Sequence, residues 1–112
     1  MCGRYALFSK DRIKNKFNID IKVNYNISPS IDVLVLNNNF DPMMMKWGIS
    51  PVWSKNKLNI INARSETMYN KSSFKNTFKC IFIADGYYEW KKDKEYKRAF
   101  YFYHKSSFLY FF

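Results

Sequence analysis

The first residues of the chain could do chemistry. Cys2 follows Met1 directly, so removal of Met1 would leave a thiol and a free α-amine on neighbouring carbon atoms. Such a 1,2-aminothiol traps an aldehyde twice: the amine condenses to a Schiff base, and the thiolate then closes a thiazolidine ring. An α-amine has an ordinary pKa of about 8 and a thiol of about 8.5, so reactive forms of both exist near neutrality. Ring closure is intramolecular, which favours it. By position alone, Cys2 could equally be an ordinary small residue at the start of a strand.

Three further blocks combine glycine, aromatic and charged residues. They are Trp47-Gly48 with Pro51 and Trp53, Asn62-Ala63-Arg64-Ser65-Glu66-Thr67, and Ala84-Asp85-Gly86-Tyr87-Tyr88-Glu89-Trp90. Of the four arginines, Arg4 lies in the N-terminal segment Cys2-Gly3-Arg4-Tyr5 and Arg64 in the second of these blocks. Arginine binds phosphate through two parallel hydrogen bonds, which lysine cannot do. We therefore regard Arg4 and Arg64 as candidate phosphate ligands.

The composition indicates a folded protein with a polyanionic partner. Hydrophobic residues make up 47 % of the 112 residues and aromatic residues 21 %, which suffices for a packed core and argues against disorder. The formal net charge of +10 favours a nucleic acid partner. That signal is discounted because fifteen of the nineteen basic residues are lysines, and AT-rich coding alone would enrich Lys, Asn, Ile, Phe and Tyr.

The composition also excludes several classes. No apolar run approaches the roughly 18 residues that span a bilayer, and the N-terminal apolar run is too short for a signal peptide. We therefore place the protein inside the cell and expect no membrane partner. Two cysteines, Cys2 and Cys80, make no disulfide framework, and with His104 as the one histidine they offer no zinc-binding pattern.

The residue pattern predicts mainly strands with short helices. Ser9 is expected to cap a helix over Lys10–Phe17, and Ser65 to cap a second over Glu66–Asn70. Met43, Met44 and Met45 are read as core or strand filler. Strands are predicted at 2–8, 32–36, 43–49, 78–84, 100–104 and 108–112, and a short extended piece at 59–63. A turn is predicted at 37–39, loops at 24–29 and 47–53, and a charged hairpin loop at 91–97.

The chain ends within an apolar strand, Phe108-Leu109-Tyr110-Phe111-Phe112, with no turn or polar tail after it. An exposed apolar edge of this kind is a pairing liability. We therefore expect the chain to be incomplete, either a fragment of a longer product or a frameshifted remnant.

In this order and spacing, the three blocks and Cys2-Gly3-Arg4-Tyr5 resemble the SRAP family, the SOS response-associated peptidase domain. Asn26 and Pro29 add to the resemblance, which covers the whole chain. It implies an α+β fold: a mainly antiparallel, curved and partly barrel-like sheet with short peripheral helices. Residues 1–112 would be a single, incomplete domain, the N-terminal part of that fold. It would be a monomer without a metal or organic cofactor.

The resemblance implies a protein of the DNA damage (SOS) response that binds single-stranded DNA and captures abasic sites covalently. It would be cytoplasmic, and associated with the nucleoid when bound to DNA. Carried over by motif, Cys2 is the nucleophile and requires loss of Met1. Asn62 would position Cys2 and the opened sugar. Glu89 would transfer protons in Schiff-base formation and in lyase-like reversal, provided that a partly apolar site raises the pKa of its carboxyl.

The resemblance also implies a DNA-binding surface. Arg4 and Arg64 would hold phosphates beside the lesion, with Ser65 in the same set. Trp53 would stack on, or wedge against, an exposed base. A further family histidine lies well downstream of the Glu-Trp pair. His104 does not match that motif, so its role is not transferred to this chain.

Other interpretations remain open. The family name suggests a cysteine-type peptidase, in which Cys2 attacks a peptide bond, such as its own junction with Met1. The chain could also be a non-catalytic remnant that binds nucleic acid weakly through lysines. Glu89 could be a solvated strand carboxylate, and Arg64 and Glu66 could form an ion pair at a helix end. Trp47 is expected in the core rather than in a contact with DNA.

Overall fold

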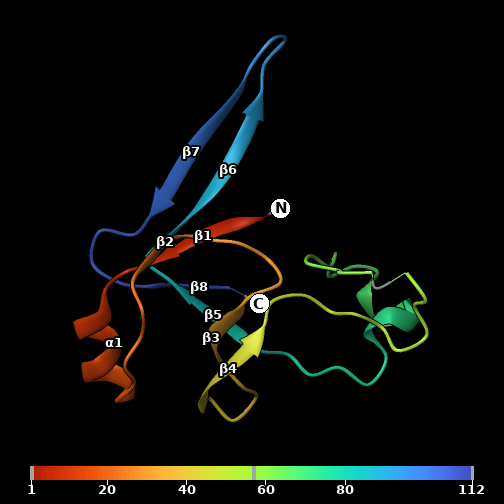
Figure 1. The fold of residues 1–112 in the computed structure, drawn as a ribbon, viewed down its shortest axis with the longest axis horizontal. Helices are drawn as coiled ribbons and strands as arrows, with labels where there is room; N and C mark the ends of the chain where they lie inside the picture. Colours follow the sequence, from red (N-terminus) through yellow and green to blue (C-terminus); the bar gives the residue numbers. More distant parts are fainter. Residues whose placement is uncertain (1, 57, 112) are drawn as a thin grey trace.

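The computed structural model describes residues 2–56 and 58–111, and within them it contains two four-stranded antiparallel sheets (Figure 1). The first sheet has the order β2-β1-β6-β7 and the second β4-β3-β5-β8. The first comprises β1 (Arg4–Leu7), β2 (Asn24–Ile27), β6 (Gly86–Lys92) and β7 (Lys97–Tyr103). The second comprises β3 (Asp32–Leu36), β4 (Pro42–Lys46), β5 (Ile81–Ala84) and β8 (Leu109–Phe111). The α+β class is confirmed, with both sheets open rather than joined into a barrel.

The helix predicted after the first strand is confirmed as α1 (Lys10–Phe17). It buries Ile13 completely and packs Phe17 against the core, at the i, i+4 spacing of one helical face. Asn18 ends it in the left-handed conformation, with φ of 55°. In the described residues, no helix is long and apolar enough to cross a membrane.

Asp85 connects the two sheets. It lies between the last residue of β5 and the first of β6, where the chain passes from one sheet to the other. Its buried carboxylate accepts hydrogen bonds from the backbone N–H of Phe8 (2.6 Å) and Ser9 (2.8 Å), and from the Ser9 hydroxyl. Its own N–H donates to the Ala6 carbonyl (2.9 Å). Ser9 therefore does not cap α1 through its side chain as predicted, because its hydroxyl is bound to Asp85.

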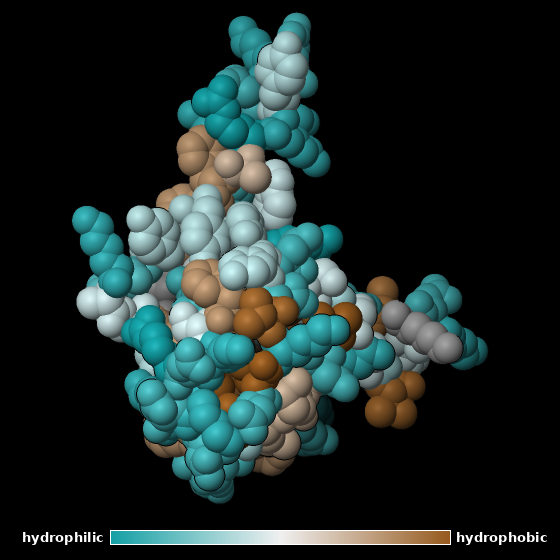
Figure 2. All heavy atoms as spheres, turned by 60° about the vertical axis from the view of Figure 1, so that its left-hand side comes forward, coloured by the Kyte–Doolittle hydropathy of each residue, from teal (hydrophilic) through white to brown (hydrophobic). Residues whose placement is uncertain are grey.

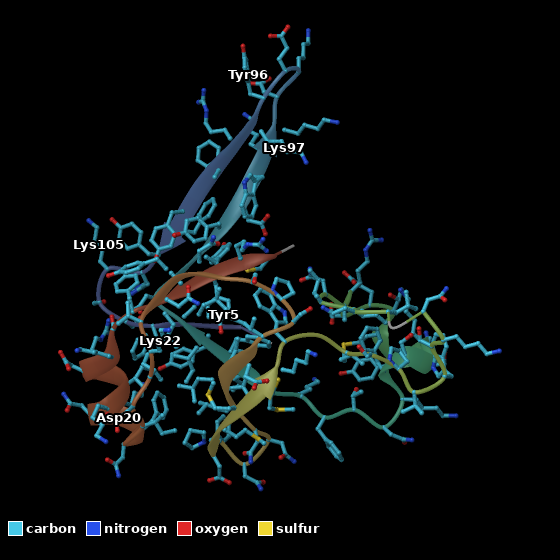
Figure 3. All side chains as sticks on the ribbon, in the orientation of Figure 1. Tyr5, Asp20, Lys22, Tyr96, Lys97 and Lys105 are labelled. Carbon is cyan, nitrogen blue, oxygen red and sulfur yellow. The ribbon has the colours of Figure 1, made fainter. Side chains whose placement is uncertain are left out.

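The core contains an aromatic cluster that links the two sheets. Tyr5 of β1 lies with its ring centroid 5.4 Å from that of Trp47 and 6.1 Å from that of Phe82 in β5, and the last two are 5.7 Å apart. Tyr5 is fully buried and lies in the interior between the sheets (Figure 3), and Trp47 is 4 % exposed. The prediction that Trp47 belongs to the core is confirmed.

Several elements differ from the sequence prediction. Segment 24–29 begins as strand β2, because Ile27 pairs with Tyr5 and is buried. The strand predicted at 78–84 is paired only from Ile81 onward. The hairpin 32–46 is confirmed, but Met43, Met44 and Met45 are 40–57 % exposed, because β4 is an edge strand.

The region after Ser65 also differs. No α-helix forms over 66–70; instead, residues 65–67 make a turn that leads into two short 3₁₀ helices, η1 (Met68–Asn70) and η2 (Ser72–Phe74). Thr67 occupies the N-cap position of η1, without a capping hydrogen bond from its side chain.

The far end of the β6–β7 hairpin projects beyond the other strands of the first sheet (Figure 1). The hairpin pairs from Gly86↔Tyr103 to Lys92↔Lys97, so the charged loop predicted at 91–97 shrinks to residues 93–96. Every residue of β7 is exposed. Hydrophilic residues cover the far end of the hairpin (Figure 2), where Tyr96 and Lys97 lie (Figure 3).

Replacing Asp85 tests the connection between the sheets. We expect Asp85→Ala to lower the free energy of unfolding by about 2–3 kcal/mol, because it leaves buried backbone N–H groups without an acceptor. Asp85→Asn keeps one acceptor oxygen and should cost about half as much. The control Asp20→Ala removes an exposed ion pair with Lys14 (2.9 Å) and should cost less than about 1 kcal/mol. Urea denaturation measures all three, and equal losses in the two alanine variants would contradict the assignment.

Candidate active site

The register of the first sheet brings Cys2 to Glu89. Arg4 of β1 pairs with Tyr88 of β6 in antiparallel orientation. Residues before Arg4 therefore run beside residues after Tyr88, and Cys2 is close enough to Glu89 for the carboxylate charge to act on its thiol. Cys2 precedes β1, and Glu89 lies within β6, so the pairing of these two strands brings residues 87 positions apart in the sequence into the same region.

The Cys2 thiol is held in its protonated form. The side chain is half-buried against the core, and this burial is the main reason that its pKa is raised above the ordinary value for cysteine. A backbone hydrogen bond at Arg4 lowers the pKa, and the negative charge of Glu89 raises it further. The thiol also donates a hydrogen bond from Sγ to the Arg4 carbonyl (3.4 Å), which favours its protonated form. The net effect is a raised pKa, so the thiolate is a minor species near neutral pH.

The surroundings of Cys2 combine a cation with open space. The Arg4 guanidinium donates a hydrogen bond from Nη1 to the Gly3 carbonyl (3.0 Å), which holds it next to Cys2. No heavy atom lies within 4 Å of the position that a Cβ on Gly3 would occupy. This edge of the site is therefore open to a ligand.

Glu89 lies in the interior of β6, opposite Phe100 of β7. Its side chain is half-buried. Because side chains alternate along a strand, Tyr88 and Trp90, whose ring centroids are 6.5 Å apart, lie on the face opposite Glu89. Glu89 is thus held by a paired strand, on the face that it shares with Phe100.

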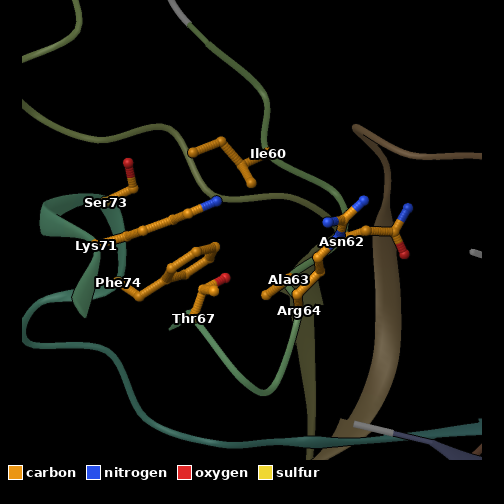
Figure 4. Close-up of a pocket in the computed structure, with 8 residues that line it drawn as sticks. All are labelled: Ile60, Asn62, Ala63, Arg64, Thr67, Lys71, Ser73 and Phe74. Atoms are coloured by element: carbon orange, nitrogen blue, oxygen red, sulfur yellow. The ribbon is translucent and has the colours of Figure 1, made fainter. Parts of the chain in front are cut away.

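Asn62 and Arg64 do not line the surroundings of Cys2 described above but the wall of a separate depression of about 410 Å³ (Figure 4). Sequence reasoning identified these two but missed the other polar and aromatic residues of the wall. The depression is lined by Ile60, Asn62, Ala63, Arg64, Thr67, Lys71, Ser73 and Phe74. The available signal was the density of hydroxyl, basic and aromatic residues within ten positions of Arg64.

Trp53 lies on an exposed loop whose base is fixed. Ile49 and Ile60 exchange two backbone hydrogen bonds of 2.9 Å, which close the loop. Gly48 enters the loop with φ of 119°, and a Cβ there would lie 1.8 Å from Asn59 Oδ1, so only glycine fits. Trp53 is 58 % exposed, so the loop presents an aromatic ring to solvent.

The turn after Arg64 presents Ser65 and Glu66 to solvent, and both are exposed. The Arg64 carbonyl accepts the N–H groups of Thr67 (3.1 Å) and Met68 (2.9 Å), which fixes the turn. Within the described residues, Arg64 and Glu66 form no ion pair. This alternative to a DNA contact for Arg64 is therefore not realised in the structure.

His104 lies after β7 and is exposed. Its Nδ1 is 2.9 Å from the Ser107 hydroxyl and accepts the backbone N–H of Ser106 (3.3 Å). In the part of the chain that the structure describes, no three His, Cys, Asp or Glu residues are grouped as a metal site would require.

The charge effect of Glu89 on Cys2 can be measured. Glu89→Gln removes one cause of the raised thiol pKa, so the pKa of Cys2 should fall and its alkylation by iodoacetamide at pH 8 should become faster. Cys80 is an internal control, because burial alone raises its pKa. Peptide mapping by mass spectrometry over a pH series separates the two thiols. An unchanged Cys2 profile, or an equal shift at Cys80, would contradict the coupling.

The chain matches a known protein family and several curated relatives in sequence. The model of the family described as SOS response associated peptidase (SRAP) matches residues 1–112. Abasic site processing protein YoqW of Bacillus subtilis is 38 % identical over an alignment of 109 residues. The match covers 82 % of this chain and 49 % of YoqW. Abasic site processing protein YedK of Escherichia coli is 33 % identical, covering 92 % of this chain and 54 % of YedK.

The fold is also similar to that of solved structures. A phage-related protein from Bordetella bronchiseptica superposes with a TM-score of 0.71 at 27 % identity, covering 98 % of this chain and 58 % of that protein. The chain thus spans about half the length of the relatives that it matches. By its sequence, the chain belongs to the SRAP family.

Proposed function

We propose that this chain captures the ring-opened aldehyde of an abasic site in single-stranded DNA as a thiazolidine on Cys2, after loss of Met1. The observation that carries the proposal is the half-buried thiol of Cys2, which packs against the core just before β1, the strand that pairs with β6 and so with the strand of Glu89. The relatives named as abasic site processing proteins support the substrate class.

The reaction needs an amine, a thiol and a proton carrier. The Cys2 amine adds to the C1′ aldehyde, and the carbinolamine loses water to give a Schiff base. The sulfur then adds to the imine carbon, and the thiol proton ends on nitrogen, so one water is released overall. Glu89 would carry protons in both steps. The reverse sequence would release the DNA.

The raised pKa of Cys2 favours this chemistry over peptide cleavage. A cysteine peptidase needs a thiolate made by a neighbouring base or a lowered pKa. Here burial and Glu89 both raise the pKa of the thiol. The one histidine, His104, has its Nδ1 occupied by the serines of its own loop. In aldehyde capture the amine makes the first bond, so a protonated thiol is no obstacle.

The other residues singled out from the sequence would hold the strand. Arg4, beside Cys2, and Arg64, in the wall of the depression, would bind the phosphates that flank the lesion. Ser65, exposed on the turn after Arg64, would add a hydroxyl. Trp53, which is exposed, would stack on the neighbouring base that loses its stacking partner at the abasic site. Asn62, at the edge of the depression, would orient the opened sugar.

The proposal includes a setting in the cell. We place the monomeric protein in the cytoplasm, on the nucleoid when bound to DNA, and in the response to DNA damage (SOS). The basic composition, with a net charge of +10, supports association with DNA at physiological salt.

Cross-link formation tests the proposal. Met1-free protein is incubated with a single-stranded oligonucleotide that carries one abasic site, and adducts are resolved on a denaturing gel and by intact mass. We expect an adduct with the mass of the sum minus one water. Cys2→Ala and protein that retains Met1 should form none. Glu89→Gln should form it about a hundredfold more slowly, because it lacks the proton carrier.

An undamaged oligonucleotide is the negative control, and Glu66→Gln is the control for loss of an exposed carboxylate near the DNA. Absence of an adduct with folded, Met1-free protein would refute the capture proposal and favour the non-catalytic interpretation. An adduct that persists in Cys2→Ala would refute the assignment of the nucleophile.

A further inference from the structure

The depression that contains Asn62 and Arg64 has a wall of mixed chemistry. The side chain of Lys71 extends across it, above the ring of Phe74 and toward the side formed by Asn62 and Arg64 (Figure 4). Thr67 lies at its edge between Phe74 and Ala63. One small space thus offers two cations, two hydroxyl groups, an amide and an aromatic ring.

Backbone hydrogen bonds hold this wall in shape. The turn at Arg64 is closed by the N–H groups of Thr67 and Met68, and the Lys71 N–H donates to the Met68 carbonyl (3.2 Å). The Phe74 N–H donates in turn to the Lys71 carbonyl (3.1 Å). The residues of the depression therefore belong to one continuous series of turns, and its cations keep a fixed spacing along the backbone.

The charges in this segment are not neutralised. Residues 60–79 carry four basic side chains against one acidic side chain. Within the described residues, neither Arg64 nor Lys71 forms an ion pair, and both side chains are exposed. The ring of Phe74 is half-buried. Unpaired cations beside an accessible aromatic ring are the combination that holds a phosphate and a stacked base in single-strand sites.

We propose that the depression binds one nucleotide of the single strand, next to the captured lesion. Lys71 and Arg64 hold its phosphodiester, and the hydroxyl groups of Thr67 and Ser73 donate to the remaining oxygen atoms. Phe74 contacts the base. This inference rests on the proposed function and adds Thr67, Lys71, Ser73 and Phe74 to the DNA-binding residues. The volume of about 410 Å³ lies in the range of pockets that hold a small ligand.

Matched lysine variants test the site. Binding of a fluorescent, undamaged single-stranded oligonucleotide is measured by anisotropy at several salt concentrations. Lys71→Gln should weaken binding about tenfold, since a charge-assisted contact is lost. It should also reduce the slope of log affinity against log salt by about 0.7, as expected for one phosphate contact. Lys75→Gln removes the same charge from the same segment but outside the depression, so it should change affinity by less than about twofold. Equal effects of the two variants would overturn the proposal.

Phe74→Leu provides a second, uncharged test. It keeps an apolar side chain but removes the stacking surface, so affinity should fall while the salt slope stays unchanged. A deoxynucleoside monophosphate is used as a competitor, because it distinguishes a site for a phosphate within a DNA strand from a site for a free nucleotide. If it displaces the oligonucleotide at micromolar concentration, the depression is a small-molecule site and the proposal fails.

The outcomes also separate this site from covalent capture. Cross-linking of the abasic oligonucleotide is measured at DNA concentrations that saturate each variant. Lys75→Gln, which lies outside the depression, should then cross-link at the wild-type rate. A selective binding defect in Lys71→Gln with no cross-link in any variant would support the depression and refute the proposed function. Normal cross-linking with unaltered binding would refute the depression alone.

Discussion

The carboxylate of Asp85 is the interaction on which the rest of the structure depends. It is buried where the chain passes from the second sheet to the first, and it holds the corner between β1 and α1 through the N–H groups of Phe8 and Ser9. A buried carboxylate is tolerated only when its oxygen atoms are satisfied, and here backbone and hydroxyl donors satisfy them. The reciprocal bond from the Asp85 N–H to Ala6 aligns β1 along β6. That alignment directs the residues just before Arg4 toward the part of β6 that follows Tyr88.

The environment of Cys2 controls the protonation of its thiol. Burial and the Glu89 carboxylate raise the pKa of the thiol, so the thiolate is a minor species near neutral pH. For a peptidase this arrangement would be a defect. In the proposed capture it would set the order of events, because the amine would react first and the thiol would follow intramolecularly. The Glu89 carboxylate, which disfavours the thiolate, would then accept the thiol proton and pass it to nitrogen.

Much of the fold could be predicted from the sequence, because its signals are local. The helix at Lys10–Phe17 and the hairpin that begins at Asp32 follow from periodicity and turn residues. Long-range effects were missed. Ser9 looks like a helix cap, but its hydroxyl is bound to a residue 76 positions away. Met43–Met45 read as core or strand filler; they do lie in a strand, but it is an edge strand that leaves them exposed, which sequence cannot show.

The candidate site shows the same division. Cys2 and Glu89 could be paired only through family resemblance, since no local pattern relates residues 87 apart, and the sheet register supplies the physical reason. The family motif also led to Asn62 and Arg64. It did not lead to Lys71 or Phe74, because their relation to Arg64 depends on two short 3₁₀ helices where the sequence predicts one α-helix.

The distribution of charge around Cys2 would constrain how a DNA strand lies in the proposed complex. Glu89 would repel phosphates, whereas Arg4, whose guanidinium is held against Gly3, would attract them. A strand that approaches Cys2 would therefore turn an uncharged part, the opened sugar, toward Glu89 and keep its phosphates on the side of Arg4. At short range, this difference between like and opposite charges would outweigh the diffuse attraction of the surface lysines, which salt screens. The lysine-rich composition could draw the polyanion to the protein, but Arg4 and Glu89 would decide which atoms of it reach the thiol.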